Sequence, residues 1–338
     1  MLLRSRAWLA ATLLLAAVMV GGAAAIAWWP AGTTARADVT PRAKLADYSW
    51  AELSAISDEL ASCTNERQAV ACASRYGLCD QQGVLDAESV KSVELADGRT
   101  VDVVLVGICQ DERTDGGVAG LTFAFADAVG PHAMNHAFED VEGFDADSKG
   151  GWAACDMRAW LADTLWYQLP TDLRAQVVPV QKRTANTLDM NDELFDPGKL
   201  AGIAKDWVSE TTDSLWLLSA CELCGDVPAR EDMGVDDSMS AVYAIEGTQY
   251  QLFFQQGVAA FAQNTSLVRS LAGEDEPCAW WLRTKTLEFG DGFWLVGTDG
   301  TPLNGLGEDV RVVEDAEYAP QEQWGPDHAR GVVVGFCL

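Results

Sequence analysis

Apolar residues at helical spacing predict two short helices near the start of the folded part of the chain. Ser49 and Glu52 have the spacing of a capping box, in which two side chains bond reciprocally to the first turn of a helix. Apolar residues then recur every three or four positions up to Leu60. A second helix is predicted over residues 66–76, ended by Gly77. We expect residues 47–85 to form a small helical element.

Shorter apolar runs predict a set of strands after this element. Residues 92–95 and 101–108 flank an Asp97-Gly98 turn and predict a β-hairpin. Further strand-like runs occupy residues 121–126, 214–219, 280–283, 293–296 and 332–336, and short elements are expected at 250–254 and 258–261. The run over residues 214–219 is continuously apolar, which predicts a strand buried on both faces.

Helices and loops are expected between these strands. Residues 155–165 have one apolar face and predict the best helix of the chain, and a helical turn is expected after Pro170. The polar stretch over residues 184–213 predicts a long loop. Short strands interleaved with two main helices and long loops predict an α+β domain over residues 86–338.

Two segments rich in cysteine and aromatic residues are predicted to form neighbouring strands of one sheet. They are residues 278–283, which contain adjacent tryptophans and an arginine, and residues 335–338. Each segment carries one cysteine, and a disulfide between them would close a long loop of the chain. We therefore expect a Cys278–Cys337 disulfide.

Residues 1–29 predict a signal anchor. Arg4 and Arg6 precede an uncharged run over residues 7–29, and a transmembrane helix needs about 20 apolar residues. A linker rich in Pro, Thr and Ala follows over residues 30–46. We expect a single-pass protein of the cell membrane with an extracellular domain. The alternative is secretion after cleavage following Ala37, because Ala35-Arg36-Ala37 has the small-x-small form of a cleavage site.

The charge of the chain restricts its partners. The sequence has 51 acidic and 23 basic side chains, which gives a formal net charge of −28. A field of that sign repels phosphate backbones, so nucleic acid is excluded as a partner. It is typical of a solvated acidic surface on an exported protein, and it favours cations and basic partners.

Nine cysteines indicate disulfides if the chain is exported, and the odd number leaves at least one thiol free. Cys221 and Cys224 are separated by two residues, and this spacing predicts a local disulfide, with a redox centre as the alternative. Cys63, Cys72 and Cys79 are candidates to staple the N-terminal helices together. The sequence leaves the complete pairing open.

The order of several segments resembles that of a bacterial family without an assigned activity, the domain-of-unknown-function family 6273. The segments are Leu121-Thr-Phe, Met134-Asn135, Gly150-Gly-Trp152, Met157-Arg-Ala-Trp-Leu161, Leu169-Pro170, Asp213-Ser-Leu-Trp-Leu-Leu-Ser219, Trp280-Trp-Leu-Arg283 and Gly335-Phe-Cys-Leu338. The resemblance implies an exported or surface protein with a C-type-lectin-like fold, in which terminal strands pair and long loops bind ligand. It implies no catalytic residues.

The chain also departs from the patterns of these relatives. Many members carry Arg-Pro-Ala before the last Phe-Cys, where this chain has Val333-Val334-Gly335. A site that needs that second arginine is therefore missing. The calcium-binding tripeptides of true C-type lectins, Glu-Pro-Asn and Gln-Pro-Asp, are absent as well, which argues against calcium-dependent sugar binding.

Two stretches, one with histidines and one acidic, approach the residue spacing of metal sites. His132 and His136, with Glu139, have the spacing of zinc ligands on one helical face, but Ala133 replaces the glutamate of the hydrolytic pattern, which favours ordinary loop histidines. Asp145, Asp147, Gly150 and Asp156 approach the spacing of a calcium loop, but Lys149 occupies a ligand position. We predict no cofactor and no metal site at these positions. A calcium site elsewhere among the acidic residues has no sequence signature that would locate it.

Arginine and tryptophan supply the candidate ligand-binding residues. Arg283 follows two tryptophans on a strand that is expected to be buried, and Arg158 lies on the amphipathic helix. A buried arginine needs a carboxylate partner, so each is either an ion pair within the fold or a contact to an anionic or sugar ligand. Trp207 and Trp324 stand in polar surroundings and are candidate stacking platforms.

Together these features favour a membrane-anchored surface protein that recognises a cell-surface glycan or protein without catalysis. The binding loops are expected at residues 184–250 and 300–330. An alternative is an oxidoreductase of the formylglycine-generating type, which shares the lectin-like fold and uses paired cysteines in an open groove. A purely structural component of the envelope is the third hypothesis.

Overall fold

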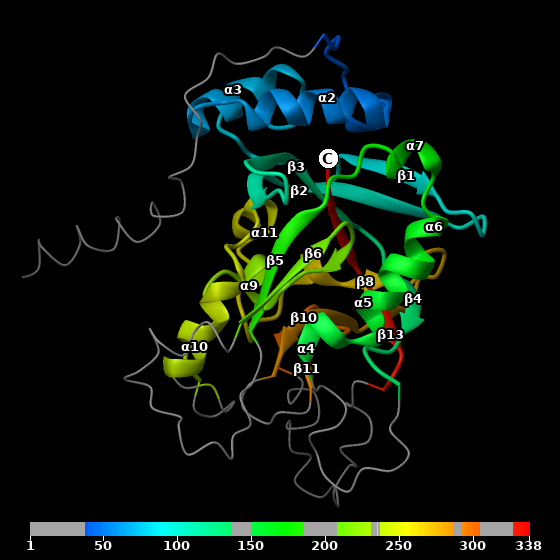
Figure 1. Ribbon diagram of the computed structural model, residues 1–338, viewed down its shortest axis with the longest axis vertical. Helices are drawn as coiled ribbons and strands as arrows, with labels where there is room; N and C mark the ends of the chain where they lie inside the picture. The colour runs from blue at the N-terminus through cyan, green and yellow to red at the C-terminus, as the bar shows by residue number, and fades with distance from the viewer. Residues whose placement is uncertain are drawn as a thin grey trace, which may run out of the picture.

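Two five-stranded sheets form the centre of the fold (Figure 1). A computed structural model describes residues 38–136, 150–185, 208–230, 235, 237–286, 292–304 and 327–338. The first sheet is antiparallel and runs in the order β1 (Val90–Glu94), β2 (Thr100–Glu112), β3 (Val118–Phe125), β14 (Val334–Cys337) and β7 (Trp216–Leu217). The second runs in the order β12 (Pro302–Leu303), β11 (Phe293–Val296), β10 (Trp280–Lys285), β13 (Arg330–Val332) and β4 (Val129–His132), with only β10 and β13 parallel.

Two small sheets and a series of short helices complete the described part. The small sheets are β5 (Val180–Ala185) with β6 (Val208–Asp213), and β8 (Arg269–Ser270) with β9 (Pro277–Cys278). The N-terminal helices are η1 (Leu45–Asp47), α2 (Trp50–Ala61) and α3 (Glu66–Arg75). The others are α4 (Gly151–Ala154), α5 (Asp156–Trp160), the π-helical segment η2 (Leu161–Leu165), α6 (Trp166–Gln168), α7 (Thr171–Arg174), α9 (Ala220–Cys224), α10 (Asp237–Tyr243), η5 (Ala244–Glu246), α11 (Gln251–Gln255) and η6 (Thr265–Leu267).

These elements confirm the predicted α+β class and most of the local predictions. The Ser49–Glu52 capping box is present at the start of α2, and the hairpin of β1 and β2 pairs Val93 with Val101 around the Asp97-Gly98 turn. Gly98 has a φ of 87°, a left-handed conformation that glycine adopts without the steric cost of a Cβ atom. Local sequence signals therefore decided these elements.

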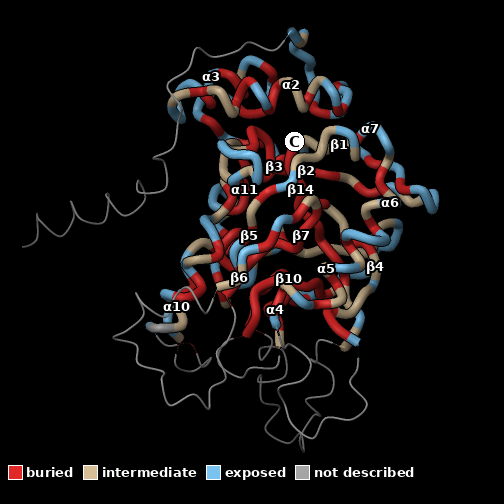
Figure 2. Tube along the Cα trace, viewed as in Figure 1, coloured by how far each residue is buried: buried red, intermediate tan, exposed pale blue. Residues whose placement is uncertain are grey.

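The helices α2 and α3 cover the outer face of the first sheet, as Figure 1 shows in blue above β1 to β3. The Trp50 ring meets Phe123 of β3 at 6.1 Å and Phe336 of β14 at 6.0 Å, and the two phenylalanine rings stack at 5.4 Å. Edge-to-face and stacked pairs of this kind add to the free energy of apolar burial. One hydrophobic cluster thus joins the N-terminal helices to the sheets, and Figure 2 shows its buried residues in red through the middle of the fold.

The predicted pairing of the two cysteine-containing segments is wrong. Strand β10 lies in the second sheet, whereas β14 lies between β3 and β7 in the first. The C-terminal segment contacts both sheets in turn. Its strand β13 pairs with β10 in the second sheet, Gly331 against Trp280, and after Val333 the chain continues as β14 in the first sheet. Gly331 allows this close approach, because a Cβ atom there would lie 2.9 Å from Cys278 Sγ.

The predicted Cys278–Cys337 disulfide is not formed, and all nine cysteines are thiols. Cys278 ends β9, while Cys337 is fully buried in β14. The Cys337 thiol lies 3.3 Å from Thr122 Oγ1 and donates to Asp111 Oδ2 at 3.5 Å. The two cysteines therefore have separate surroundings in different sheets.

Two further expectations need correction or lie outside the described residues. The stretch over residues 184–213 is not loop throughout, because its two ends belong to the paired strands β5 and β6. Within the described ranges, no helix has the length and apolar character needed to cross a bilayer. The predicted span over residues 1–29 lies outside those ranges.

Candidate functional site

An open cleft of about 510 Å³ lies between the helical stretch from α4 to α6 and the turn that joins β6 to β7. Alanines form much of its lining, so the cleft exists because small side chains leave space between the helices and the turn. The lining residues are Ala153, Ala154, Cys155, Arg158, Ala159, Leu161, Ala162, Trp166, Tyr167, Thr212, Asp213, Ser214 and Leu215.

Arg158 is held against one wall of this cleft by an ion pair. Its Nε donates to Asp213 Oδ1 at 2.7 Å and its Nη2 to the Thr212 carbonyl at 3.1 Å. The Asp213 side chain is 4% exposed, and its second oxygen accepts hydrogen bonds from Trp152 Nε1 at 3.1 Å and Thr211 Oγ1 at 2.6 Å. These bonds fix the orientation of the guanidinium group before any ligand arrives.

The guanidinium group remains partly available to a ligand. The Arg158 side chain is 30% exposed. Its third bond, from Nη1 to the Ala153 carbonyl, is 3.5 Å long. A guanidinium group has five N–H donors, so two of them have no partner among the described residues. Those donors can bind hydroxyl, carbonyl or carboxylate oxygens.

A π-helical segment, Leu161–Leu165, lies beside Arg158 and lines the cleft. The segment continues α5 into α6, with Leu161 and Leu165 buried and Ala162 exposed. Short π-helical segments inside α-helices are frequent at functional sites. The sequence predicted a regular helix over residues 155–165, and its apolar spacing did not indicate the wider turn.

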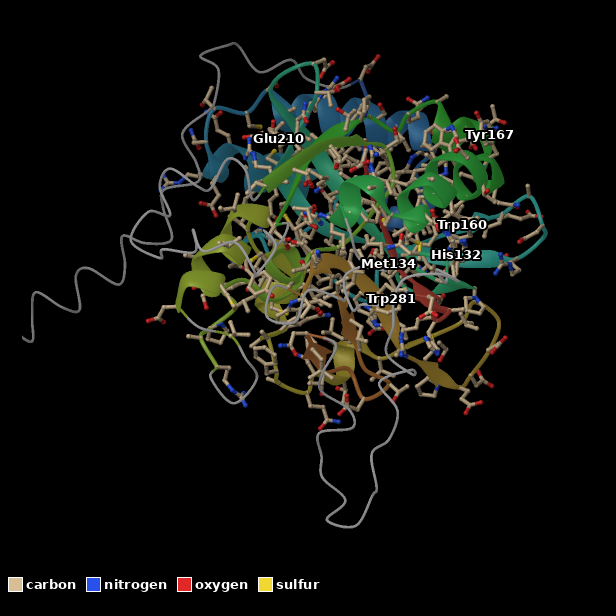
Figure 3. All side chains as sticks on the ribbon, turned by 60° about the horizontal axis from the view of Figure 1, so that its bottom comes forward. His132, Met134, Trp160, Tyr167, Glu210 and Trp281 are labelled. Carbon is tan, nitrogen blue, oxygen red and sulfur yellow. The ribbon has the colours of Figure 1, made fainter. Side chains whose placement is uncertain are left out.

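Tyr167 projects from α6 at the rim of the cleft and is 63% exposed (Figure 3). The Arg174 guanidinium lies 5.5 Å from the centre of its ring, which fixes the ring by a cation–π contact. The neighbouring Trp166 is partly buried and also lines the cleft. An exposed aromatic ring beside a partly exposed arginine can bind a ligand that has both apolar faces and oxygen atoms.

The other predicted arginine, Arg283, is buried in the core. Its two terminal nitrogens bond both oxygens of Glu222, and Nη2 lies 3.0 Å from Oε1. Its remaining donors reach the Leu217, Arg183 and Glu246 carbonyls and Thr184 Oγ1. The Arg283 side chain is 0% exposed, and its donors are used within the fold. Arg283 therefore forms an ion pair within the fold and has no access to a ligand.

Glu222 also binds Lys182 and so links two buried cations. Lys182 Nζ donates to Glu222 Oε1 at 2.8 Å, to Tyr250 at 2.9 Å, and to Asp111. Burial alone would raise the pKa of Glu222, but Arg283 and Lys182 outweigh it and lower that pKa to about 2. Burial likewise opposes the charged form of Lys182, and the carboxylates of Asp111 and Glu222 raise its pKa. This network is inaccessible and ties strands to helix α9.

His132 and His136 have separate partners in the structure. His132 ends β4 and stacks on Trp160 with 4.5 Å between ring centres, while His136 lies in an irregular segment and bonds Asp156 at 2.5 Å. Figure 3 shows His132 beside Trp160, and Trp281 Nε1 donates to the His132 carbonyl at 3.2 Å. The described residues contain no group of three or more potential metal ligands, and Glu139 lies outside them.

Several other candidate residues also lie outside the described ranges. They are Trp207, Trp324, Asp145 and Asp147. Of the calcium-loop residues that are described, Gly150 precedes α4 and Asp156 starts α5.

Cys221 and Cys224 lie within α9 as buried thiols. The Cys221 thiol donates to the Tyr243 carbonyl at 2.9 Å. Burial raises the pKa of both thiols, which disfavours the nucleophilic thiolate. The predicted local disulfide is therefore not formed, and the open cysteine groove that an oxidase would need is not found at this pair.

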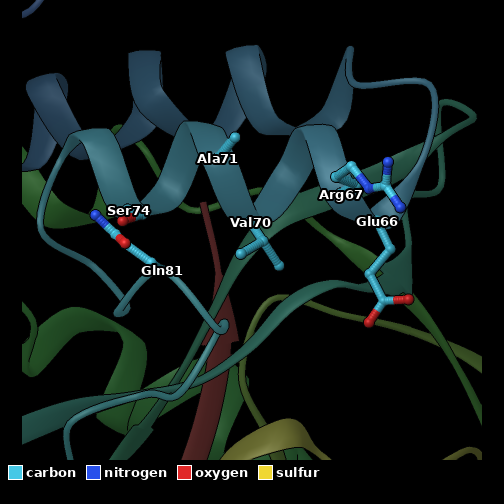
Figure 4. Close-up of a pocket in the computed structure, with 6 residues that line it drawn as sticks. All are labelled: Glu66, Arg67, Val70, Ala71, Ser74 and Gln81. Carbon is cyan, nitrogen blue, oxygen red and sulfur yellow. The ribbon is translucent and has the colours of Figure 1, made fainter.

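A second hollow of about 500 Å³ follows the outer side of α3 (Figure 4). It is lined by Glu66, Arg67, Val70, Ala71, Ser74 and Gln81. This hollow contains neither an aromatic side chain nor a buried ion pair among those residues. The cleft at Arg158 is the better candidate site.

The comparison with protein families places the cleft within a known domain family. The family described as Domain of unknown function (DUF6273) matches residues 129–312. The chain belongs to the DUF6273 family. All residues that line the cleft fall within the matched DUF6273 segment. No curated protein and no solved structure is detectably similar to the chain.

The sequence indicated Arg158 but missed its partners in the cleft. Asp213 is the last residue of β6, and its pairing with Arg158 spans 55 positions of the chain. Tyr167 follows the apolar face of the predicted helix by two residues, with no pattern that distinguishes it from other surface aromatics. The available signal for Asp213 was a carboxylate directly before the apolar run over residues 214–219.

Proposed function

We propose that this DUF6273 protein is an exported, membrane-anchored surface protein whose lectin-like domain binds a glycan without catalysis. The observation that carries the proposal is the cleft in which a preorganised Arg158 stands beside the exposed Tyr167. Sugars present C–H groups on one face and hydroxyl oxygens at their edges. An aromatic ring and an arginine with available donors match these two features.

The cleft overlaps one of the loop regions that the sequence indicated for binding. Thr212, Asp213, Ser214 and Leu215 fall within residues 184–250. The uncharged run over residues 7–29 supports export and a membrane anchor, and the net charge of −28 disfavours nucleic acid as the ligand. A lectin-like fold is consistent with the α+β class and the short strands. A protein ligand is the other outcome to test.

We expect Tyr167→Ala to weaken glycan binding by about 10-fold, because loss of an exposed stacking ring removes on the order of 1–2 kcal/mol. The measurement is binding of the full chain to a glycan array and to isolated cell-wall fractions, followed by titration of the best ligand. Phe254→Ala is the matched control, because Phe254 is 71% exposed but lies on α11, away from α6 in Figure 1.

A second variant tests the cleft as a whole. Ala159→Trp places a large side chain at an exposed alanine of the lining and leaves the core unchanged, so we expect it to abolish binding. Absence of binding to any glycan or wall fraction by the wild-type chain would refute the glycan proposal. Binding that survives both cleft variants would place the site elsewhere.

A further inference from the structure

Three cysteine thiols gather where α2 ends, beneath α3 and beside β2. Cys63 follows α2 by two residues and is 1% exposed, and Cys72 lies on α3 and is 5% exposed. Cys109 of β2 is partly exposed. The Cys63 and Cys109 thiols lie 3.6 Å and 3.5 Å from the Glu59 and Leu60 carbonyls, which belong to adjacent residues of the last turn of α2.

Within this group, Cys63 and Cys72 are the matched pair. Cys63 lies 3.6 Å from the Glu59 carbonyl. Arg75, which pairs with the Glu59 carboxylate, lies 3.7 Å from the Cys72 sulfur, so both thiols lie beside the same residue. Burial raises the pKa of Cys63, and its neighbour Cys72 acts in the opposite direction. Two neighbouring thiols at adjacent helices can reach the S–S bond length of about 2.05 Å through side-chain movement. Cys79 of the same helical region is directed to the Val70 carbonyl at 3.8 Å.

We propose that Cys63 and Cys72 are an oxidation site that forms a disulfide between α2 and α3 as the protein matures. The structure describes the reduced form of this site. The bond would close a ten-residue loop, from Cys63 to Cys72, and hold together the two helices that cover the first sheet.

The oxidant is a disulfide, either a small-molecule disulfide or the cysteine pair of an oxidising enzyme. The Cys63 thiolate attacks one sulfur of R–S–S–R and releases one R–SH. The Cys72 sulfur then displaces the second R–SH from the mixed disulfide. The two cysteines lose two electrons, the oxidant disulfide gains them, and the two thiol protons end on the released thiols.

Formation during folding fits the surroundings of these thiols. Burial raises the pKa of Cys72 to about 12, although the Arg75 guanidinium, 3.7 Å from its sulfur, acts in the opposite direction. A thiol with such a pKa is rarely the attacking thiolate at neutral pH. The exchange is therefore expected while the helices are still accessible to solvent.

Refolding of the full chain tests this site. The unfolded, reduced protein is refolded in a buffer of reduced and oxidised glutathione, alkylated with N-ethylmaleimide, and digested with trypsin. Because Arg67 lies between the two cysteines, the disulfide joins two separate peptides that mass spectrometry identifies directly. We expect this linked pair, two fewer alkylated thiols, and an unfolding midpoint about 5 °C above that of protein refolded with dithiothreitol.

Matched serine variants identify the partners. Cys63→Ser and Cys72→Ser should each abolish the difference of about 5 °C. Cys79→Ser should retain it, because within the described ranges the Cys79 thiol is directed to the Val70 carbonyl and not to another thiol. Nine alkylated thiols after refolding in glutathione, or a link from Cys63 or Cys72 to Cys109, would overturn the proposal. If a variant does not fold, the peptide map of the unaltered chain decides the question.

Discussion

At the scale of single residues, glycines decide how closely the layers pack. Gly120 of β3 lies under α2, where a Cβ atom would come within 2.0 Å of the Ser57 carbonyl oxygen. The Ser57 hydroxyl accepts a hydrogen bond from Leu121 N at 3.1 Å. Ser57 is therefore held against β3 both by this bond and by the contact of its backbone with Gly120. Gly335 of β14 leaves similar room for the Trp216 ring, whose nearest atoms would be 2.9 Å away. Helix, strand and core tryptophan reach contact only because no side chain intervenes.

We expect Gly120→Ala to lower the free energy of unfolding by about 3 kcal/mol, because backbone rather than a flexible side chain blocks the added methyl group. Urea unfolding followed by tryptophan fluorescence measures the change. Gly98→Ala is the control: its surroundings are open, and only its φ of 87° carries a cost of about 1 kcal/mol. Equal losses in both variants would contradict the close packing of α2 on β3.

At the scale of elements, buried charges join pieces of chain that the hydrophobic pattern alone would not orient. Glu222 is in the first turn of α9, where its side chain also caps the helix by accepting from Ser219 N at 2.9 Å. It pairs with Lys182 of β5 and Arg283 of β10. Lys182 also lies 3.9 Å from the ring centre of Trp216. A single carboxylate thus fixes one helix against two strands from different sheets.

We expect Glu222→Gln to lower the free energy of unfolding by about 3–5 kcal/mol, because it leaves two buried cations with one fewer charged partner. Thermal and urea unfolding measure this loss. Glu210→Gln is the matched control, since Glu210 pairs with Arg183 at 3.0 Å but both side chains are well exposed. The control should change stability by less than about 0.5 kcal/mol. If Glu222→Gln lowered the free energy of unfolding no more than the Glu210→Gln control, the structural role of the network would be contradicted.

At the scale of the whole molecule, the same region makes folding stability depend on pH. Glu246 is fully enclosed, accepts a hydrogen bond from Ala185 N at 2.9 Å and is bonded by the Thr284 hydroxyl. Burial raises its pKa to about 7, while the nearby Arg283 guanidinium acts in the opposite direction. A carboxyl group with a raised pKa binds its proton more tightly in the folded state than in the unfolded state.

We expect the free energy of unfolding of the wild type to fall between pH 5 and pH 8. This fall should be larger than that of Glu246→Gln by on the order of 2 kcal/mol. The stability from Glu246 is fully present below its unfolded pKa of about 4.5 and is lost as pH rises through about 7. Urea midpoints measured across this range test the difference. The repulsion among the acidic surface residues is common to both proteins, so parallel curves would show that Glu246 does not titrate there.

Glu222 produces the opposite trend at lower pH. Its lowered pKa of about 2 contributes stability that is present above the unfolded pKa and is lost as pH falls through about 2. The combined contribution of these two glutamates to stability is therefore greatest near the unfolded pKa of about 4.5.

The local elements follow from the sequence alone, because their signals depend on neighbouring residues. Capping residues, the Asp97-Gly98 turn and the apolar runs that became β10 and β11 are effects of a few adjacent positions. The same reasoning predicted the α+β class and identified the family stretches. The sequence also indicates Arg158, and it allows either an ion pair or a ligand contact for this residue.

Which distant segments meet depends on the packing of the complete fold. It separated β10 from β14 into two sheets, left Cys278 and Cys337 as unpaired thiols, and gave Arg283 to Glu222, 61 positions away. It also brought Asp213 to Arg158 and placed Tyr167 at the same cleft. The physical reason is that strand pairing and buried ion pairs depend on the packing of the whole core, whereas periodicity reports only which face of a segment is buried.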